Sequence, residues 1–183
     1  FPGVAGALDA LPSPDFVVDS EAALAYLVNL GIIPLHTWSA RVSSLEKPDW
    51  CILDLDPMET PFSVVVKVAR TIYNLCHALG LPSAVKTSGS TGLHVLVPLG
   101  GTLTHALSRT LAELLGRVVV MDHPDWATVS RAVSHRVGTV YIDCGQNGQG
   151  RILAAPFCAR PVPGARVSMP FKWTEVTQRL DIG

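Results

Sequence analysis

The stretch WCILDLDP, Trp50 to Pro57, decides the fold. Its apolar residues are strand formers, and the two-residue period of a strand sends Asp54 and Asp56 to the same face. We therefore predict a buried strand from Trp50 to Asp56 that Pro57 ends, with both carboxylates at the mouth of a loop. Two neighbouring carboxylates repel each other unless one takes up a proton or a cation lies between them.

Paired carboxylates favour a hard divalent cation, because Mg²⁺ and Mn²⁺ prefer oxygen ligands. The same Asp-x-Asp-Pro pattern also occurs where an aspartate caps a helix or closes a turn. Asp54 and Asp56 are therefore candidate metal ligands, and the pattern by itself leaves both interpretations open.

Helical and strand periods alternate along the rest of the chain, which predicts an α/β (α+β) fold with a sheet backed by helices. We interpret residues 1–18 as a lead-in segment and residues 19–183 as a single domain. Residues 150–157 are predicted to pair with the strand over 138–146, across the turn at 146–150. The other predicted elements are helices within 19–31, 61–81 and 104–120, strands over 84–87 and 93–99, an extended segment over 32–41, a short helix or loop over 125–134, and a short helix near the end of 162–180.

Composition narrows the classes of function. The 14 Lys and Arg residues against 15 Asp and Glu residues give a net charge of −1, so any nucleic-acid contact must be local. No apolar run reaches the roughly 18 residues that span a bilayer, and we expect a cytoplasmic, nucleoid-associated protein without a membrane partner. The four cysteines have no Cys-x-x-Cys spacing and are predicted to be reduced core residues. Basic residues concentrate in the last third, at Arg131, His135, Arg136, Arg151, Arg160, Arg166, Lys172 and Arg179.

A third acid and a glycine-rich turn complete a candidate site. Asp143 ends the strand in VYIDCGQN, and acids from two strands are what two-metal phosphoryl transfer requires. In KTSGSTGLH the glycines let backbone N–H groups approach a triphosphate, and nearby side chains can donate to its oxygens or offset its charge. Plain hairpin chemistry is the alternative for this turn, and His94 is alternatively a core histidine. The candidate nucleotide-binding residues of the turn are Lys86, Ser88, Gly89, Gly92 and His94.

Five strings resemble the polymerase domain of bacterial DNA ligase D, in the archaeo-eukaryotic primase superfamily. They are NLGIIPLHTWSAR, PDWCILDLDP, VKTSGSTGLHVLVPL, RVGTVYIDCGQN and APFCARPVPGARVSMPFKWTEV, and they run in the family's order. The resemblance implies a primase-type core with a mainly antiparallel sheet. It also implies a nucleotidyltransferase that uses two Mn²⁺ or Mg²⁺ ions to add nucleotides, ribonucleotides by preference, to DNA 3′ ends in non-homologous end joining.

The resemblance also assigns roles to single residues. Asp54, Asp56 and Asp143 fall on the family's metal ligands and are the candidate catalytic residues. The implied partners are a nucleoside triphosphate, DNA ends or gapped DNA, and adjoining ligase and nuclease domains or an end-binding repair protein. The positions that contact the triphosphate are Ser88, Gln146 and Arg160, His94 closes the same motif as Ser88, and His36 is given a nucleotide-binding or structural role.

The sequence departs from the family pattern at several positions that bear on activity. Thr91 replaces a phosphate-binding lysine, Phe157 and Cys158 replace a Tyr-Ser pair, and Ile152 replaces a threonine. We also expect the chain to lack the family's N-terminal segment, which carries base-stacking aromatics and the lysines for a downstream 5′-phosphate. A weakened module that binds nucleotides or DNA ends without incorporation is therefore one alternative. A metal-dependent phosphohydrolase that uses the same acids and needs no primer is another, and only the acids support it.

Overall fold

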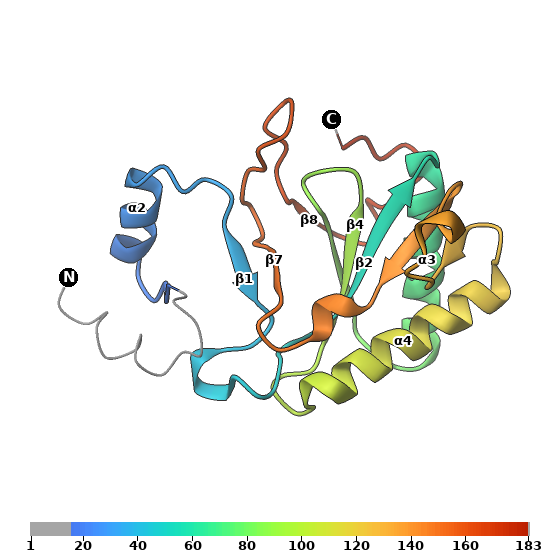
Figure 1. Ribbon diagram of the computed structural model, residues 1–183, viewed down its shortest axis with the longest axis horizontal. Coiled ribbons are helices and arrows are strands. Elements are labelled where there is room, and N and C mark those ends of the chain that lie inside the picture. The colour runs from blue at the N-terminus through green and yellow to red at the C-terminus, as the bar shows by residue number, and fades with distance from the viewer. Residues whose placement is uncertain (1–15, 183) are drawn as a thin grey trace.

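The computed structural model describes residues 16–182, so most of the predicted lead-in segment lies outside the described residues. A six-stranded sheet has the order β5-β6-β2-β4-β3-β8, and a separate two-stranded sheet joins β1 to β7. Helices α3 and α4 cover one face of the large sheet, while α2 and the small sheet lie on the other side (Figure 1). The elements are α2 (Glu21–Asn29), β1 (His36–Trp38), the 3-10 helix η1 (Val42–Ser44), β2 (Trp50–Met58), α3 (Phe62–Ala78), β3 (Ala84–Thr87), β4 (Leu93–Pro98), α4 (His105–Asp122), β5 (Ala127–Thr128), η2 (Val133–His135), β6 (Thr139–Asp143), η3 (Gly145–Asn147), β7 (Ile152–Ala154) and β8 (Pro170–Phe171).

Strand β2 lies at the centre of the large sheet, as the sequence predicts. It pairs antiparallel with β4 on one side and with β6 on the other. Leu53 and Leu55 are fully buried and belong to the core cluster that contains α3 and α4 residues. Because the strand alternates, Asp54 and Asp56 lie on the opposite face. The predicted α/β fold with a mainly antiparallel sheet is confirmed.

Local capping signals set the helix boundaries that the sequence predicts. The hydroxyl of Ser20 accepts a hydrogen bond from the Ala23 N–H at the start of α2, and Thr104 accepts one from Leu107 at the start of α4. Helix α3 is followed by Gly80 in a left-handed conformation, with a φ of 69°. These side chains act within one turn, so their effect does not depend on the rest of the fold.

Strand β2 continues past the residue that was predicted to end it. Pro57 pairs with Val140 of β6, and Met58 pairs with Thr139. Strand β4 begins at Leu93, opposite Leu55, so β2 has no β4 partner beyond that point. Pro57 lacks an N–H group, but no β4 carbonyl lies opposite this position to accept a hydrogen bond from it. The hydrogen bonds between β2 and β6 are therefore undisturbed.

The predicted pairing of residues 150–157 with 138–146 is wrong. Strand β6 already has β2 on one edge and the short parallel strand β5, which the sequence analysis missed, on the other. Strand β7 instead pairs with β1, where Leu153 lies opposite Thr37. In the stretch over 125–134, β5 is followed by the 3-10 helix η2.

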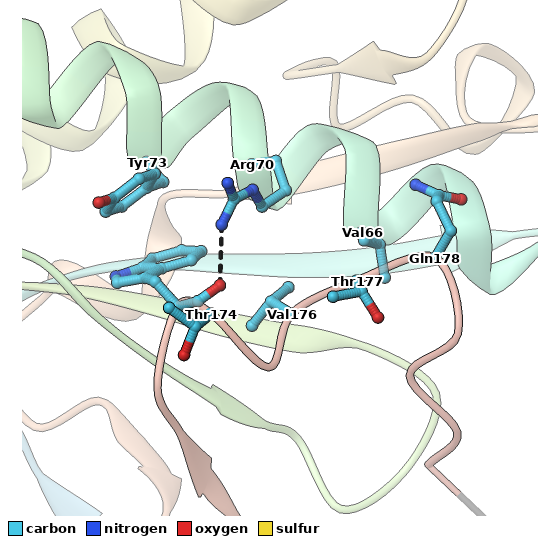
Figure 2. Close-up of a pocket in the computed structure, with 8 residues that line it drawn as sticks. Val66, Arg70, Tyr73, Thr174, Val176, Thr177 and Gln178 are labelled. Atoms are coloured by element: carbon cyan, nitrogen blue, oxygen red, sulfur yellow. Dashed lines mark hydrogen bonds between the residues drawn. The ribbon is translucent and has the colours of Figure 1, made fainter.

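The short helix predicted near the end of residues 162–180 is absent from the described structure. Residues Pro170–Phe171 form β8 against β3, and the Thr87 N–H donates to the Met169 carbonyl. Further along, Arg70 of α3 donates to the carbonyl of Trp173 at 2.8 Å (Figure 2). Tertiary hydrogen bonds thus hold this segment against the sheet edge and α3, as the strand β8 followed by turns.

The cysteines agree with the sequence prediction. Cys51, Cys76, Cys144 and Cys158 are all buried free thiols, as predicted. Within residues 16–182, no helix combines the length and the apolar character that crossing a membrane requires.

Candidate active site

Three acids and a histidine meet on the face of the sheet that α3 and α4 leave uncovered. The pairing register places Asp54 opposite His94 of β4 and opposite Asp143 of β6. Asp56 lies two residues further along β2, opposite Tyr141. The structure therefore brings together the three acids and the histidine that the sequence singled out.

Asp54 is the most enclosed of the three acids, with 8% of its surface exposed. Its Oδ1 lies 3.2 Å from Nε2 of His94, which is itself 3% exposed. The alignment of the two groups is poor, and among the described residues no hydrogen bond is formed to this buried oxygen. An unsatisfied buried carboxylate oxygen is costly, so it is a natural ligand for a cation.

Asp143 is held by its own loop. Its Oδ1 accepts a hydrogen bond from the Gly145 N–H at 2.7 Å and another from the Tyr141 hydroxyl at 3.3 Å. The guanidinium of Arg136 lies over the Tyr141 ring, 3.5 Å from its centroid. Tyr141, Arg136 and Gly145 thus position Asp143, and none of them was singled out from the sequence for this role.

Asp56 is the most exposed of the acids, yet its environment disfavours the charged form. Partial burial of the carboxyl group, followed by the negative charges of Asp54 and Asp143, raises the pKa of Asp56 to about 6. The positive charge of Arg136 opposes this shift. Three carboxylates compressed in this way repel one another, which a divalent cation would relieve.

The donor set fits a hard divalent cation in its chemistry. All three side chains offer carboxylate oxygens, and one of these oxygens is buried without a hydrogen bond. In residues 16–182, however, no group of three or more His, Cys, Asp or Glu side chains is arranged as a metal site. Asp143 is turned toward Gly145 and Asp54 toward His94, so bound cations would have to draw these carboxylates together.

The polar row continues across β4 and β3 beneath the surface. Lys86 is 3% exposed, and its Nζ lies 2.7 Å from Nδ1 of His94 and 2.7 Å from the Ser168 hydroxyl. Burial lowers the pKa of Lys86 to about 8, although Asp54 opposes the shift. While Lys86 is protonated it donates to Nδ1, which leaves the His94 proton on Nε2, facing Asp54. The row thus links Asp54, His94, Lys86 and Ser168.

The glycine-rich turn between β3 and β4 is a compact loop closed by Ser88. The Ser88 hydroxyl accepts from the N–H groups of Ser90 and Gly92, both at 3.1 Å. Gly89 has a φ of 73°, and an added Cβ at Gly92 would collide with the Leu55 carbonyl of β2. The absence of a side chain at Gly92 therefore lets the loop lie directly against the strand that carries Asp54 and Asp56.

Two arginines from the C-terminal segment hold this loop. Arg160 donates from Nη1 to the Ser88 carbonyl at 3.1 Å, and Arg166 donates to the Ser90 carbonyl at 2.9 Å. Among the described residues, Nε of Arg160 is buried without a hydrogen-bond partner. A cation with an unsatisfied donor beside a glycine-rich loop suits an anion. Arg166 was not singled out from the sequence, since its partner is 76 residues away.

The remaining predicted residues lie apart from the polar row. Gln146 is half-buried in η3, three residues beyond Asp143. Its neighbour Asn147 is fully buried, and its side-chain amide bonds both the N–H and the carbonyl of Ile52, so it extends the ladder of β2 where β6 ends. His36 is exposed on β1, in the small sheet, opposite Ala154.

Comparison with known proteins defines the class of this fold and site. A family model described as LigD, primase-polymerase domain, matches residues 9–182. The chain belongs to this family of primase-polymerase domains.

Relatives give the family assignment detail. The chain is 32% identical over 169 residues to the multifunctional non-homologous end joining protein LigD of Pseudomonas aeruginosa, covering 90% of this chain and 20% of that protein. It is 25% identical over 166 residues to the bifunctional LigD of Bacillus subtilis, covering 90% of this chain and 27% of that protein. The chain thus spans about a fifth to a quarter of these relatives.

A solved structure matches the whole architecture. The polymerase domain from Mycobacterium tuberculosis ligase D, in complex with DNA, superposes with a TM-score of 0.82 at 27% identity. The match covers 91% of this chain and 61% of that chain. The predicted primase-type core is therefore confirmed.

Proposed function

We propose that this domain is a metal-dependent nucleotidyltransferase that adds nucleotides, ribonucleotides by preference, to DNA 3′ ends in end-joining repair. The observation that carries the proposal is the register of the sheet, which aligns Asp54 with Asp143 and leaves Asp56 beside them. Its family membership supports the same reaction class, and the relatives it matches act in non-homologous end joining by their names.

In this proposal Asp54, Asp56 and Asp143 hold two Mn²⁺ or Mg²⁺ ions. Such ions, when bound, lower the pKa of the attacking hydroxyl and offset the charge of the leaving pyrophosphate. Nε2 of His94 lies 3.2 Å from Oδ1 of Asp54 and positions this carboxylate, while the oxygen itself has no hydrogen bond among the described residues and is available to a cation. Lys86 positions His94 and does not contact the substrate itself, because its ammonium group is buried and bonded to Nδ1 of His94.

The triphosphate is assigned to the glycine-rich loop. Arg160, with its unsatisfied Nε, and the backbone N–H groups around Gly89 lie where phosphate oxygens would be received. Gln146 and His36 are kept as nucleotide contacts from the family resemblance, with Gln146 approaching from the Asp143 side of the site. Thr91 offers a hydroxyl where the family has a lysine, so we expect weaker triphosphate binding than in the family's other members.

A primer-extension assay tests the function. The substrate is a gapped, 5′-phosphorylated primer–template with Mn²⁺, and ribonucleotides and deoxynucleotides are supplied in parallel. We expect extension by the wild type and none by Asp54→Ala or Asp56→Ala. Retained turnover in either variant would falsify the assignment of the acids.

Two other outcomes separate the alternatives. Nucleotide binding by calorimetry without any extension supports the module that binds without incorporation. The orientation of Asp54 toward His94 and of Asp143 toward Gly145 makes this module the second candidate. Release of nucleoside monophosphate or inorganic phosphate without a primer supports a phosphohydrolase instead.

A further inference from the structure

A pocket lined by several arginines lies on the opposite side of the acids from the glycine-rich loop. It has a volume of about 180 Å³, several times the roughly 30 Å³ that a water molecule takes in the liquid, so it has room for a phosphate group. Its walls come from α4, from the loop after β5 and from the end of β6. The lining includes Arg109, Glu113, Arg117, Arg131, Tyr141 and Asp143.

Positive charge in this pocket is only partly offset. Arg109 donates to Glu113 at 2.9 Å on the same helix, and these two charges cancel. Within residues 16–182, no acidic side chain forms an ion pair with Arg117 or Arg131, and both residues are exposed. The chain as a whole has a net charge of −1, so these two exposed arginines without ion pairs create a local positive potential at the pocket.

The pocket adjoins the proposed catalytic acids directly. A Cβ built on Gly145 would lie 2.9 Å from Oδ1 of Asp143 and 3.3 Å from Nη2 of Arg131. The guanidinium and the carboxylate therefore approach Gly145 together. The Gly145 N–H and the Tyr141 hydroxyl both donate to Oδ1 of Asp143, and within residues 16–182 no ion pair joins Asp143 to Arg131.

We infer that Arg117 and Arg131 bind a backbone phosphate of the DNA strand that supplies the 3′-hydroxyl. The inference rests on the proposed function. The attacking and leaving oxygens of a phosphoryl transfer lie roughly in line, so the primer must approach the acids from the side away from the triphosphate. The glycine-rich loop and Arg160 lie on the β4 side of β2, and this pocket lies on the β6 side.

Arginine is suited to this role because its planar fork matches two phosphate oxygens at once. The contact would carry no sequence information, which suits an enzyme that must accept any broken end. Primer and triphosphate would then be held by separate cationic groups on either side of the carboxylates.

The test measures DNA binding apart from catalysis. Arg117→Gln and Arg131→Gln are compared with Arg179→Gln, which removes the same charge from the exposed C-terminal segment. Fluorescence anisotropy with a recessed primer–template should give a dissociation constant about tenfold higher for each pocket variant and unchanged for Arg179→Gln. The slope of log K against log salt should fall by about 1 for each pocket variant. Circular dichroism and melting temperature check that the variants fold.

A chemically altered primer locates the contact. Single uncharged methylphosphonates are placed in turn at the phosphates nearest the primer 3′ end. One position should weaken binding to the wild type and have no further effect on Arg131→Gln, because the same contact is already lost. Additive losses at every position would overturn the inference.

Nucleotide binding without DNA distinguishes the two sources of phosphate. Calorimetry with a nucleoside triphosphate and Mn²⁺ should give the same affinity for the wild type and both pocket variants. If the variants lose nucleotide affinity and keep DNA affinity, the pocket holds the triphosphate and the inference is wrong. A wild type that extends no primer but binds DNA through Arg117 and Arg131 removes the proposed function and keeps the inference. If Arg117→Gln and Arg131→Gln extend primers and bind them with unchanged affinity, the proposed function stands and the inference is wrong.

Discussion

The two faces of the large sheet use the same strands for opposite purposes. On the face covered by α3 and α4, Leu53 and Leu55 of β2 are fully buried among apolar neighbours. On the other face, Asp54 of the same strand lies in a row with His94 and Lys86. The difference teaches that one strand can supply stability at odd positions and unsatisfied charge at even positions, because the pleat keeps the two environments apart.

The largest expected effect is on the charged face. Asp54→Asn should lower nucleotide transfer at least a thousandfold, about 4 kcal/mol of transition-state stabilisation, since it removes a metal ligand while keeping the shape. The free energy of unfolding should stay equal or rise, because a buried oxygen without a hydrogen bond loses its charge.

Primer extension and urea unfolding measure the two quantities for Asp54→Asn. Asp122→Asn, in the last turn of α4, is the matched control. A loss of stability larger than about 1 kcal/mol would mean that the charged face also holds the fold together, and the comparison of the two faces would break.

The next effect is on the apolar face. Leu53→Ala should lower the free energy of unfolding by about 3 kcal/mol, because it leaves a cavity in a closely packed core. Urea unfolding checks this, with Leu79→Ala as control, since that side chain follows α3 and is 59% exposed. Transfer per folded molecule should stay near the wild-type value, and a collapse of activity at full folding would show that the two faces are coupled.

Buried Lys86 gives the charged face a measurable pH dependence. Its pKa is about 8 in the folded protein and near its ordinary value, about 10.5, in the unfolded chain. Between these values the unfolded state binds more protons, so this group makes the fold more stable as the pH rises from 8 to 10, by about 2 kcal/mol.

The variant Lys86→Met isolates that contribution. Burial raises the pKa of Cys51 and of Cys144 to about 12, so both thiols act in the opposite direction above pH 9. Subtracting the variant's unfolding free energies from those of the wild type at pH 8 and at pH 10 cancels the thiols. A difference that does not change with pH would show that Lys86 is not deprotonated in the folded protein.

The smallest expected effect is cation stabilisation. Mn²⁺ at ten times its dissociation constant should raise the free energy of unfolding by about 1.4 kcal/mol, and a chelator should reverse it. Thermal unfolding of the wild type and of Asp54→Asn measures the gain, which the variant should lose. Equal stabilisation of both proteins would place the cation elsewhere.

Sequence reasoning succeeded mainly where the signal was local, although Pro57 does not end β2. The strand over 50–56 and the helices within 61–81 and 104–120 were confirmed, because the strand period, the Gly80 stop and the Thr104 cap each act within a few residues. It failed where tertiary pairing decides, because β2 and β5 lie on the two edges of β6 and β7 pairs with β1 instead.

The candidate site divides along the same line. The pairing of β2 with β4 and with β6 brings Asp54, His94 and Asp143 together, as expected. Ser168, which receives a hydrogen bond from Lys86, lies 82 residues away in a segment with no local signal, and it was missed.

The row from Asp54 to Ser168 also bears on how the chain folds. Its contacts join residues far apart in the sequence, such as Lys86 with Ser168 across 82 positions. Contacts of such long range form slowly, because their loops must close before any interaction rewards them. In refolding, the proposed transfer activity should therefore return last, after the helices and the β3–β4 hairpin have formed. Recovered activity would then indicate that the long-range contacts of the whole domain are in place.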